Sequence, residues 1–261
     1  MTIIRHELKQ NIISLIIWTL GIGFLLAVCI LIFPDMKTEA GDISSLFSSM
    51  GGFTEAFGMD KVSFGTLTGF YAIECGNILG LGGAFFASLT AVSILAKEEN
   101  GHTAEFLFTH PVRRIRIVTE KLIAVFLQII LLSLTVFVLA VCCIAFIGET
   151  VPWEELILLH LAYFLLQAEL AGICFGISAF LRRGSIGIGL GLAVTMYFLN
   201  LIANLSDQWE FLKYVTPFGY AEGTDIVTEL CLDTRLVLIG MVLMAAGAAG
   251  GYVKYCHKDI F

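Results

Sequence analysis

Six long apolar runs separated by short polar connections dominate this sequence of 261 residues. The runs are about 18 to 28 residues long, and an α-helix needs about 20 apolar residues to cross the hydrocarbon core of a bilayer. A helix also satisfies its own backbone hydrogen bonds in lipid, where no water is present. The lengths therefore predict an all-α, polytopic membrane protein with six transmembrane helices. Charged residues make up only 14% of the chain, against about a quarter in a typical soluble domain.

The predicted spans cover residues 12–33, 69–96, 122–147, 156–181, 186–203 and 235–253. We expect Pro34 to end the first span, because proline cannot continue a helical hydrogen-bond ladder. Segments 34–68 and 204–234 contain acidic residues interleaved with large apolar ones, and we expect both to be amphipathic and extracytoplasmic. No linker divides the chain, so residues 1–261 are predicted to form a single transmembrane domain.

Residues 1–11 precede the first span and alternate apolar with charged side chains at helical spacing. Ile4 and Leu8 share one helical face, whereas Arg5 and Lys9 lie elsewhere on the helix. This pattern is typical of a short helix that lies in the membrane interface. We therefore expect an N-terminal interfacial helix before the first span.

Residues 97–121 form a charged interval between the second and third spans and hold five of the fifteen Lys and Arg residues. The interval also contains the consecutive large apolar residues Phe106, Leu107 and Phe108. Thr103 suits the N-cap of one short helix, and Pro111 suits the first turn of the next. A charged loop that also presents large apolar side chains is a candidate interaction surface. The simpler alternative is a basic juxtamembrane loop held by lipid headgroups.

This interval closely resembles the cytoplasmic loop of bacterial ABC-type export permeases of the type-two class. The resemblance rests on Glu98, Gly101, Thr103, Glu105, Phe106, Leu107, Pro111, Arg114 and Lys121, and the sequence departs from the family pattern at His102 and Arg113. Weaker matches lie at residues 212–218 and in the C-terminal tail. The resemblance implies that segment 97–121 is a cytoplasmic coupling loop, in which these residues, Arg113 and Arg116 dock into a groove of a separate ABC ATPase subunit.

The resemblance further implies a permease subunit of an ATP-driven ABC exporter, which couples ATP hydrolysis by the ATPase to substrate efflux. A second permease subunit, identical or related, would complete the pore in the bacterial cytoplasmic membrane. The chain lacks the phosphate-loop pattern G-x-x-x-x-G-K-[ST], so we expect that it is not an enzyme. ATP and Mg²⁺ are expected to bind to the partner ATPase instead. We expect no cofactor, catalytic residue or metal site in this chain, because the seven cysteines show no ligand spacing. The net charge of −7 argues against nucleic acid as a partner.

The basic residues predict the orientation. With loop 97–121 on the cytoplasmic side, eleven of the fifteen Lys and Arg residues fall on that side, as the positive-inside rule requires. Both termini are then expected to be cytoplasmic.

Glu74 and Glu169 are the carboxylates within the predicted spans. A charge at the bilayer centre costs about 2.5–3.5 kcal/mol even on the lenient insertion scale, so Glu169 should face protein or water, or be protonated. Gln128 and Gln167 are candidate polar neighbours. These four residues are candidates for a translocation path or gate, whereas the alternative is a neutral acid hydrogen-bonded to a neighbouring helix.

Two other functions stay open on these residues. An ion-coupled secondary transporter would use Glu169 to carry a proton or cation. A membrane sensor or immunity protein would capture a ligand without moving it.

Four Gly-x3-Gly pairs, which begin at residues 76, 172, 187 and 247, allow close helix approach. They serve either a dimer seam or packing within the chain.

Overall fold

The computed structural model describes residues 2–39, 41, 51–97, 113–181 and 185–257. Every regular element in these ranges is a helix. Six helical segments are long and apolar enough to cross a membrane. The predicted all-α, polytopic fold with six transmembrane helices is therefore confirmed.

Five of the spans are single helices: α1 (Thr2–Thr38), α8 (Arg114–Phe146), α9 (Trp153–Ser178), α10 (Ile186–Leu205) and α12 (Thr234–His257). The second span is composite and consists of α4 (Leu67–Phe70), the π-helices η1 (Tyr71–Cys75) and η2 (Ile78–Gly82), and α5 (Gly83–Val92). π-Helical turns are rare, and they often occur at functional sites. The glycines of this span allow close contact, since the Tyr163 hydroxyl lies against Gly76.

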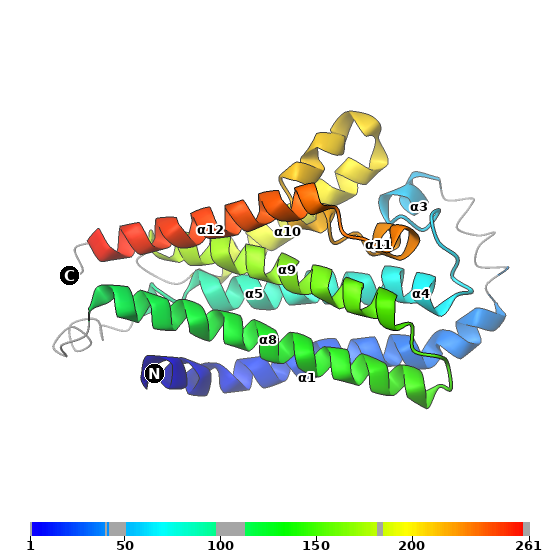
Figure 1. Ribbon diagram of the computed structural model, residues 1–261, viewed down its shortest axis with the longest axis horizontal. Helices are drawn as coiled ribbons and strands as arrows, with labels where there is room; N and C mark the ends of the chain where they lie inside the picture. Colours follow the sequence, from blue (N-terminus) through cyan, green and yellow to red (C-terminus); the bar gives the residue numbers. More distant parts are fainter. Residues whose placement is uncertain (1, 40, 42–50, 98–112, 182–184, 258–261) are drawn as a thin grey trace.

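The helices run roughly along one long axis (Figure 1). Both described chain ends lie at the same end of the bundle as the end of α5 and the start of α8, and we call this the loop end. The opposite end carries four short helices: α3 (Gly52–Ala56), η3 (Asp207–Tyr214), η4 (Pro217–Gly219) and α11 (Gly223–Glu229).

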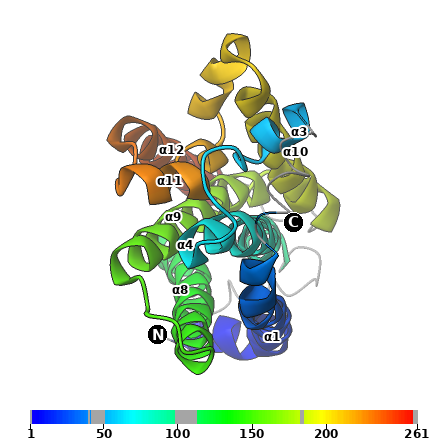
Figure 2. The same cartoon turned by 90° about the vertical axis from the view of Figure 1, so that its right-hand side faces the viewer.

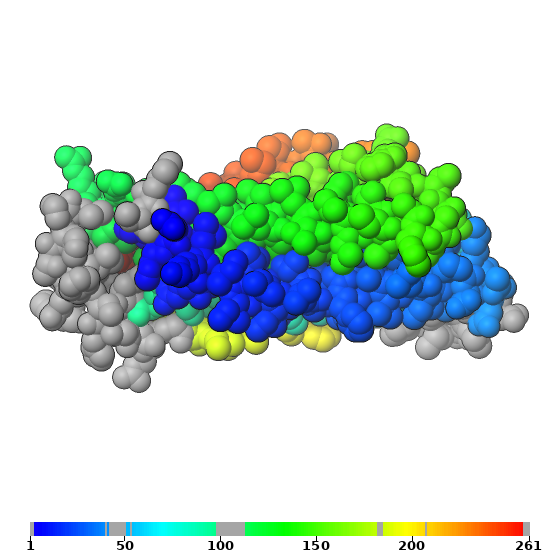
Figure 3. Space-filling view, turned by 90° about the horizontal axis from the view of Figure 1, so that it is seen from below, coloured from blue at the N-terminus to red at the C-terminus, as the bar shows by residue number. Residues whose placement is uncertain are grey.

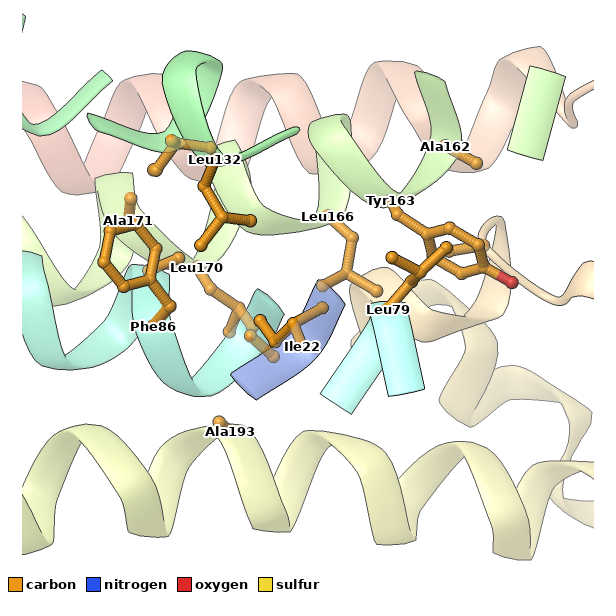
Figure 4. Packing of buried hydrophobic residues seen from close by; sticks show 14 of the residues in the cluster. Ile22, Leu79, Phe86, Leu132, Ala162, Tyr163, Leu166, Leu170, Ala171 and Ala193 are labelled. Atoms are coloured by element: carbon orange, nitrogen blue, oxygen red, sulfur yellow. The ribbon is translucent and has the colours of Figure 1, made fainter. Parts of the chain in front are cut away.

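Helix α9 is the centre of the bundle and packs against α5, α8 and α12. Helix α1 lies along α8, and α10 lies along α5 and η3. The end-on view shows α9 and α4 between the α1–α8 pair and the α10–α12 side (Figure 2). Phe86 and Ala171 pack together in the core between α5 and α9 (Figure 4).

The first span differs from the prediction at both ends. Helix α1 is continuous from Thr2, so residues 2–11 are its first turns and not a separate interfacial helix. Pro34 lies inside α1, which continues to Thr38. Packing holds the last turns in place, because Phe33 is buried in a cluster with Phe64 and Phe70.

Two glycine pairs serve packing within the chain. A Cβ added at Gly247 of α12 would lie 2.7 Å from the Gly172 carbonyl oxygen of α9, and Gly176 and Gly251 approach each other across the same contact. By contrast, a Cβ at Gly191 of α10 would meet nothing within 4 Å.

We expect the substitution Gly247→Ala to destabilise the protein by about 1–3 kcal/mol, because the new methyl group meets backbone that must move. Thermal unfolding in detergent should show a lower Tm for this variant. The matched substitution Gly191→Ala adds the same methyl group in open space and should leave the Tm unchanged or slightly raised. Equal Tm values for the two variants would contradict the close α9–α12 approach.

Candidate functional site

The two ends of the predicted coupling loop are held together at the loop end. After α5 the chain is no longer α-helical, and side chains of the three helices α1, α8 and α9 form hydrogen bonds with it. The Ser178 hydroxyl of α9 accepts a hydrogen bond from the Leu95 backbone N–H at 2.9 Å, and the Ile94 carbonyl accepts one from the Lys121 ammonium of α8 at 2.6 Å. The Lys97 ammonium binds the Glu7 carboxylate and, at 2.8 Å, Gln10 Oε1 of α1. These contacts fix where the loop leaves the membrane.

Glu7 joins the two ends directly. Its carboxylate binds Lys97, the last described residue before the loop, and lies 3.1 Å from the ammonium of Lys121 in the first turns of α8. Glu7 is 1% exposed and Lys121 0%. A buried charge is costly unless it is paired and hydrogen-bonded, so each member of this cluster depends on the others. The Glu7–Lys97–Lys121 cluster is therefore a rigid connection between α1 and both ends of the loop.

A second set of contacts ties the chain termini to the start of α8. Glu120 accepts a hydrogen bond from the Ile3 backbone N–H at 3.2 Å and pairs with Arg116 at 2.8 Å. Arg114 donates to the carbonyl of Cys256 at 3.3 Å, near the end of α12. Seen from below, the first turns of α1 lie directly against α8 (Figure 3). Helices α1, α8 and α12 thus meet around the end of the loop.

The predicted docking residues divide into two groups. Glu98, Gly101, Thr103, Glu105, Phe106, Leu107 and Pro111 lie outside the described residues. Of the others, Arg113 and Arg116 are exposed, whereas Arg114 is partly buried against α12. Lys121 is buried beneath the surface, so any effect it has on docking passes through the position of the loop.

Glu169 lies in the middle of the bundle and is 2% exposed. Its carboxylate accepts a hydrogen bond from the Tyr220 hydroxyl at 2.9 Å, and it packs against Gly240 of α12. Beside this pair is a cavity of about 170 Å³, lined mainly by apolar side chains: Phe126, Phe164, Leu165, Val237, Met241 and Met244. The arrangement gives a single carboxylate an apolar surrounding and one hydrogen-bond donor.

The other candidate polar residues point elsewhere. Gln167 lies against Gly83 of α5 and accepts a hydrogen bond from Ser133 at 3.3 Å, on a different face of α9 from Glu169. Gln128 donates to the Ala124 carbonyl of its own helix at 3.1 Å. Glu74 is partly buried on η1. Within the described part of the chain, no hydrogen bond brings these three residues to Glu169.

Sequence reasoning missed Glu7, Tyr220 and Glu222. In the sequence, Glu7 looks like one more polar residue of an N-terminal segment. The available signal was that Lys97 and Lys121, the first and last residues of the predicted loop, both need a negatively charged partner. Glu222 is a partly buried carboxylate beside α11 that accepts hydrogen bonds from Asn200 and Asn204. Burial raises the pKa of Glu222 above its ordinary value, and the two amide donors oppose that shift.

Comparison with protein families gives one match that spans almost the whole chain. Residues 1–259 match the model of the ABC-2 family transporter proteins. A comparison with curated proteins found no match.

The substitution Glu7→Gln should strongly destabilise the protein, because it removes the carboxylate charge that lies 3.1 Å from the buried Lys121 ammonium. Removal of one partner of a buried ion pair typically costs about 3–5 kcal/mol. Thermal or urea unfolding in detergent measures the loss. The control Glu149→Gln breaks the exposed Lys37–Glu149 pair and should cost less than about 1 kcal/mol.

The double variant Glu7→Leu with Lys121→Met removes both buried charges and should regain much of that stability. A Glu7→Gln variant as stable as the Glu149→Gln control would contradict the proposed rigidity of the cluster.

Proposed function

Because the chain belongs to the ABC-2 transporter family, we propose that it is the membrane-spanning permease subunit of an ATP-driven export system. A separate ATPase subunit hydrolyses ATP, and the permease converts the movement of that subunit into efflux of a substrate. ATP and Mg²⁺ are bound by the partner. The chain acts as a pair with a second permease subunit in the bacterial cytoplasmic membrane, with the loop end and both termini in the cytoplasm.

The observation that carries this proposal is the double anchoring of the loop. A loop that transmits force must not move independently of the helices at its base. Here Glu7 holds residue 97 on one side and Lys121 on the other, and Ser178 extends the connection to the central helix α9. A displacement of the loop therefore moves α1, α8 and α9 together.

The surface that contacts the ATPase is proposed to combine apolar and basic residues. Phe106 and Leu107 supply the apolar part, and the exposed Arg113 and Arg116 supply charge. Exposed basic residues at the edge of an interface chiefly affect association rate and salt dependence, whereas buried apolar anchors supply most of the affinity.

The variant Phe106→Asp with Leu107→Asp should lose co-purification with the ATPase, because two charges replace the apolar anchors of the interface. The measurement is the amount of ATPase retained on the tagged permease, together with vanadate-sensitive ATP hydrolysis in proteoliposomes. The control Phe211→Asp changes an exposed phenylalanine on η3, at the opposite end of the bundle, and should retain the ATPase. ATPase binding that is unimpaired in the double variant contradicts the docking surface.

A second candidate function is ion-coupled secondary transport, and the observation that favours it is the buried Glu169–Tyr220 pair beside an apolar cavity. If Glu169 carried protons, the permease alone would take up protons when a membrane potential is applied.

We expect no such uptake. Proteoliposomes with a pH-sensitive dye inside should show the same response to a potassium–valinomycin potential for the wild type and for Glu169→Gln, because ATP drives the system. Proton uptake by the wild type that disappears in Glu169→Gln would favour secondary transport over the ATP-driven exporter.

A further inference from the structure

The end of the bundle opposite the loop contains a small polar cavity of about 40 Å³ between the second span, α9, α10 and the residues before α11. Its polar lining consists of Asn77, Tyr163, Tyr197, Asn200 and Glu222. The Tyr163 ring packs beside Leu79, and its hydroxyl points away from the apolar core around Leu166 (Figure 4). None of these residues takes part in the proposed docking to the ATPase.

Among the described residues, the Glu222 carboxylate has hydrogen bonds but no ion-pair partner. Its Oε2 accepts from Asn200 Nδ2 at 2.8 Å and from Asn204 Nδ2 at 3.0 Å. No ion pair found in the described part of the chain includes Glu222. The ammonium of Lys61, which acts on Glu222 only at longer range, is paired with Asp225 at 2.6 Å. Beyond what these hydrogen bonds supply, such a carboxylate is stabilised by a proton or by a cation.

Among the described residues, the amide oxygen of Asn200 in the cavity lining lacks a donor. Asn200 is 5% exposed, and its Oδ1 is buried without a hydrogen-bond partner. The Asn200 amide nitrogen donates to Glu222. A flip of the amide group would place Oδ1 against the Glu222 carboxylate, and the two oxygens would repel each other. The Tyr197 hydroxyl donates to Asn77 Oδ1 at 3.0 Å, which leaves that oxygen one lone pair. Buried acceptors gathered beside a cavity indicate a ligand that supplies positive charge.

We propose that this cavity binds one alkali metal cation, held by oxygen atoms of Glu222 and Asn200, with Asn77 and Tyr163 beside it. Oxygen ligands suit hard cations, and a single carboxylate balances a single positive charge. A volume of about 40 Å³ exceeds the roughly 10–15 Å³ that one water-sized occupant needs, so an ion fits with a water molecule. Within the described ranges no group of three or more His, Cys, Asp or Glu side chains gathers, which disfavours a divalent metal.

A neighbouring acidic cavity favours the approach of a cation. This second cavity, of about 220 Å³, is also lined by Glu222, together with Glu210, Lys213, Asp225, Glu229 and Asp233. A cleft with an excess of one sign of charge raises the local concentration of the opposite ion. Glu222 lies in the lining of both cavities, so its carboxylate is next to the acidic cavity as well as to the buried oxygens.

The position of the site predicts what the ion does. Its ligands come from α10 and the residue directly before α11, with Asn77 of the second span and Tyr163 of α9 beside them. Asn204, which shares Glu222 with Asn200, also donates to the Ala56 carbonyl of α3 at 3.2 Å. A bound cation therefore stabilises the packing of the short helices α3 and α11 against the bundle.

The test uses the purified permease in nanodiscs, without the ATPase, at pH 8. The Tm of the wild type should rise and saturate as NaCl or KCl replaces N-methyl-D-glucamine chloride at constant ionic strength. Glu222→Gln, which keeps the shape and removes the charge, should lose this rise. Glu229→Gln removes a carboxylate of the outer cavity alone and should keep it. Binding of ²²Na⁺ should fall at least tenfold in Glu222→Gln and in Asn200→Leu, but not in Glu229→Gln.

A wild-type Tm that is the same in all three salts, together with no ²²Na⁺ binding, overturns the proposal and leaves a proton as the partner of Glu222. Cation binding that survives both Glu222→Gln and Asn200→Leu also overturns it, since the ion then lies elsewhere. The ATPase is absent from these measurements, so their outcome is independent of whether the loop docks as proposed.

Discussion

A buried carboxylate on the first helix determines how the loop end of this protein is built. Glu7 lies between Lys97 and Lys121, so one side chain on α1 neutralises charges on both sides of the connection between the second and third spans. Electrostatic attraction is strong where water is excluded, and the geometry of the cluster is correspondingly well defined. The termini, the loop ends and the central helix are arranged around it.

The two ends of the bundle use polar groups differently. At the loop end, the buried carboxylates Glu7 and Glu120 are each paired with basic side chains. At the opposite end, Glu222 and the Asn200 amide oxygen have no matching positive group among the described residues, although hydrogen bonds hold them in place. Between the ends, α9 and α12 meet at glycines, where backbone contacts backbone and little rearrangement is possible.

The number and approximate positions of the six spans could be predicted, because membrane thickness sets the length of an apolar run, although α1 and α8 begin well before the predicted spans. The prediction that Pro34 ends the first helix was wrong. It rested on the local propensity of proline alone, whereas the packing of Phe33 holds the helix together beyond this point. The Glu7–Lys121 pair could not be predicted, because its partners are 114 residues apart and periodicity carries no information about such contacts. Glu222 was hidden among many acids of the outer segments, and Asn200 looked like a polar residue near the end of a span. Orientation, docking residues and the partner subunits remain predictions.

The π-helical turns of the second span have a consequence for how that span is interpreted. Each such turn holds one residue more than an α-helical turn. Each extra residue rotates everything after it by about 100° relative to an unbroken α-helix. Phe70 of α4 and Phe86 of α5 lie before and after the two π-helices, and both are buried. An unbroken α-helix would place them about 160° apart, so their common burial does not follow from regular helical spacing. A helical wheel drawn through the whole segment is therefore correct for only one of its halves.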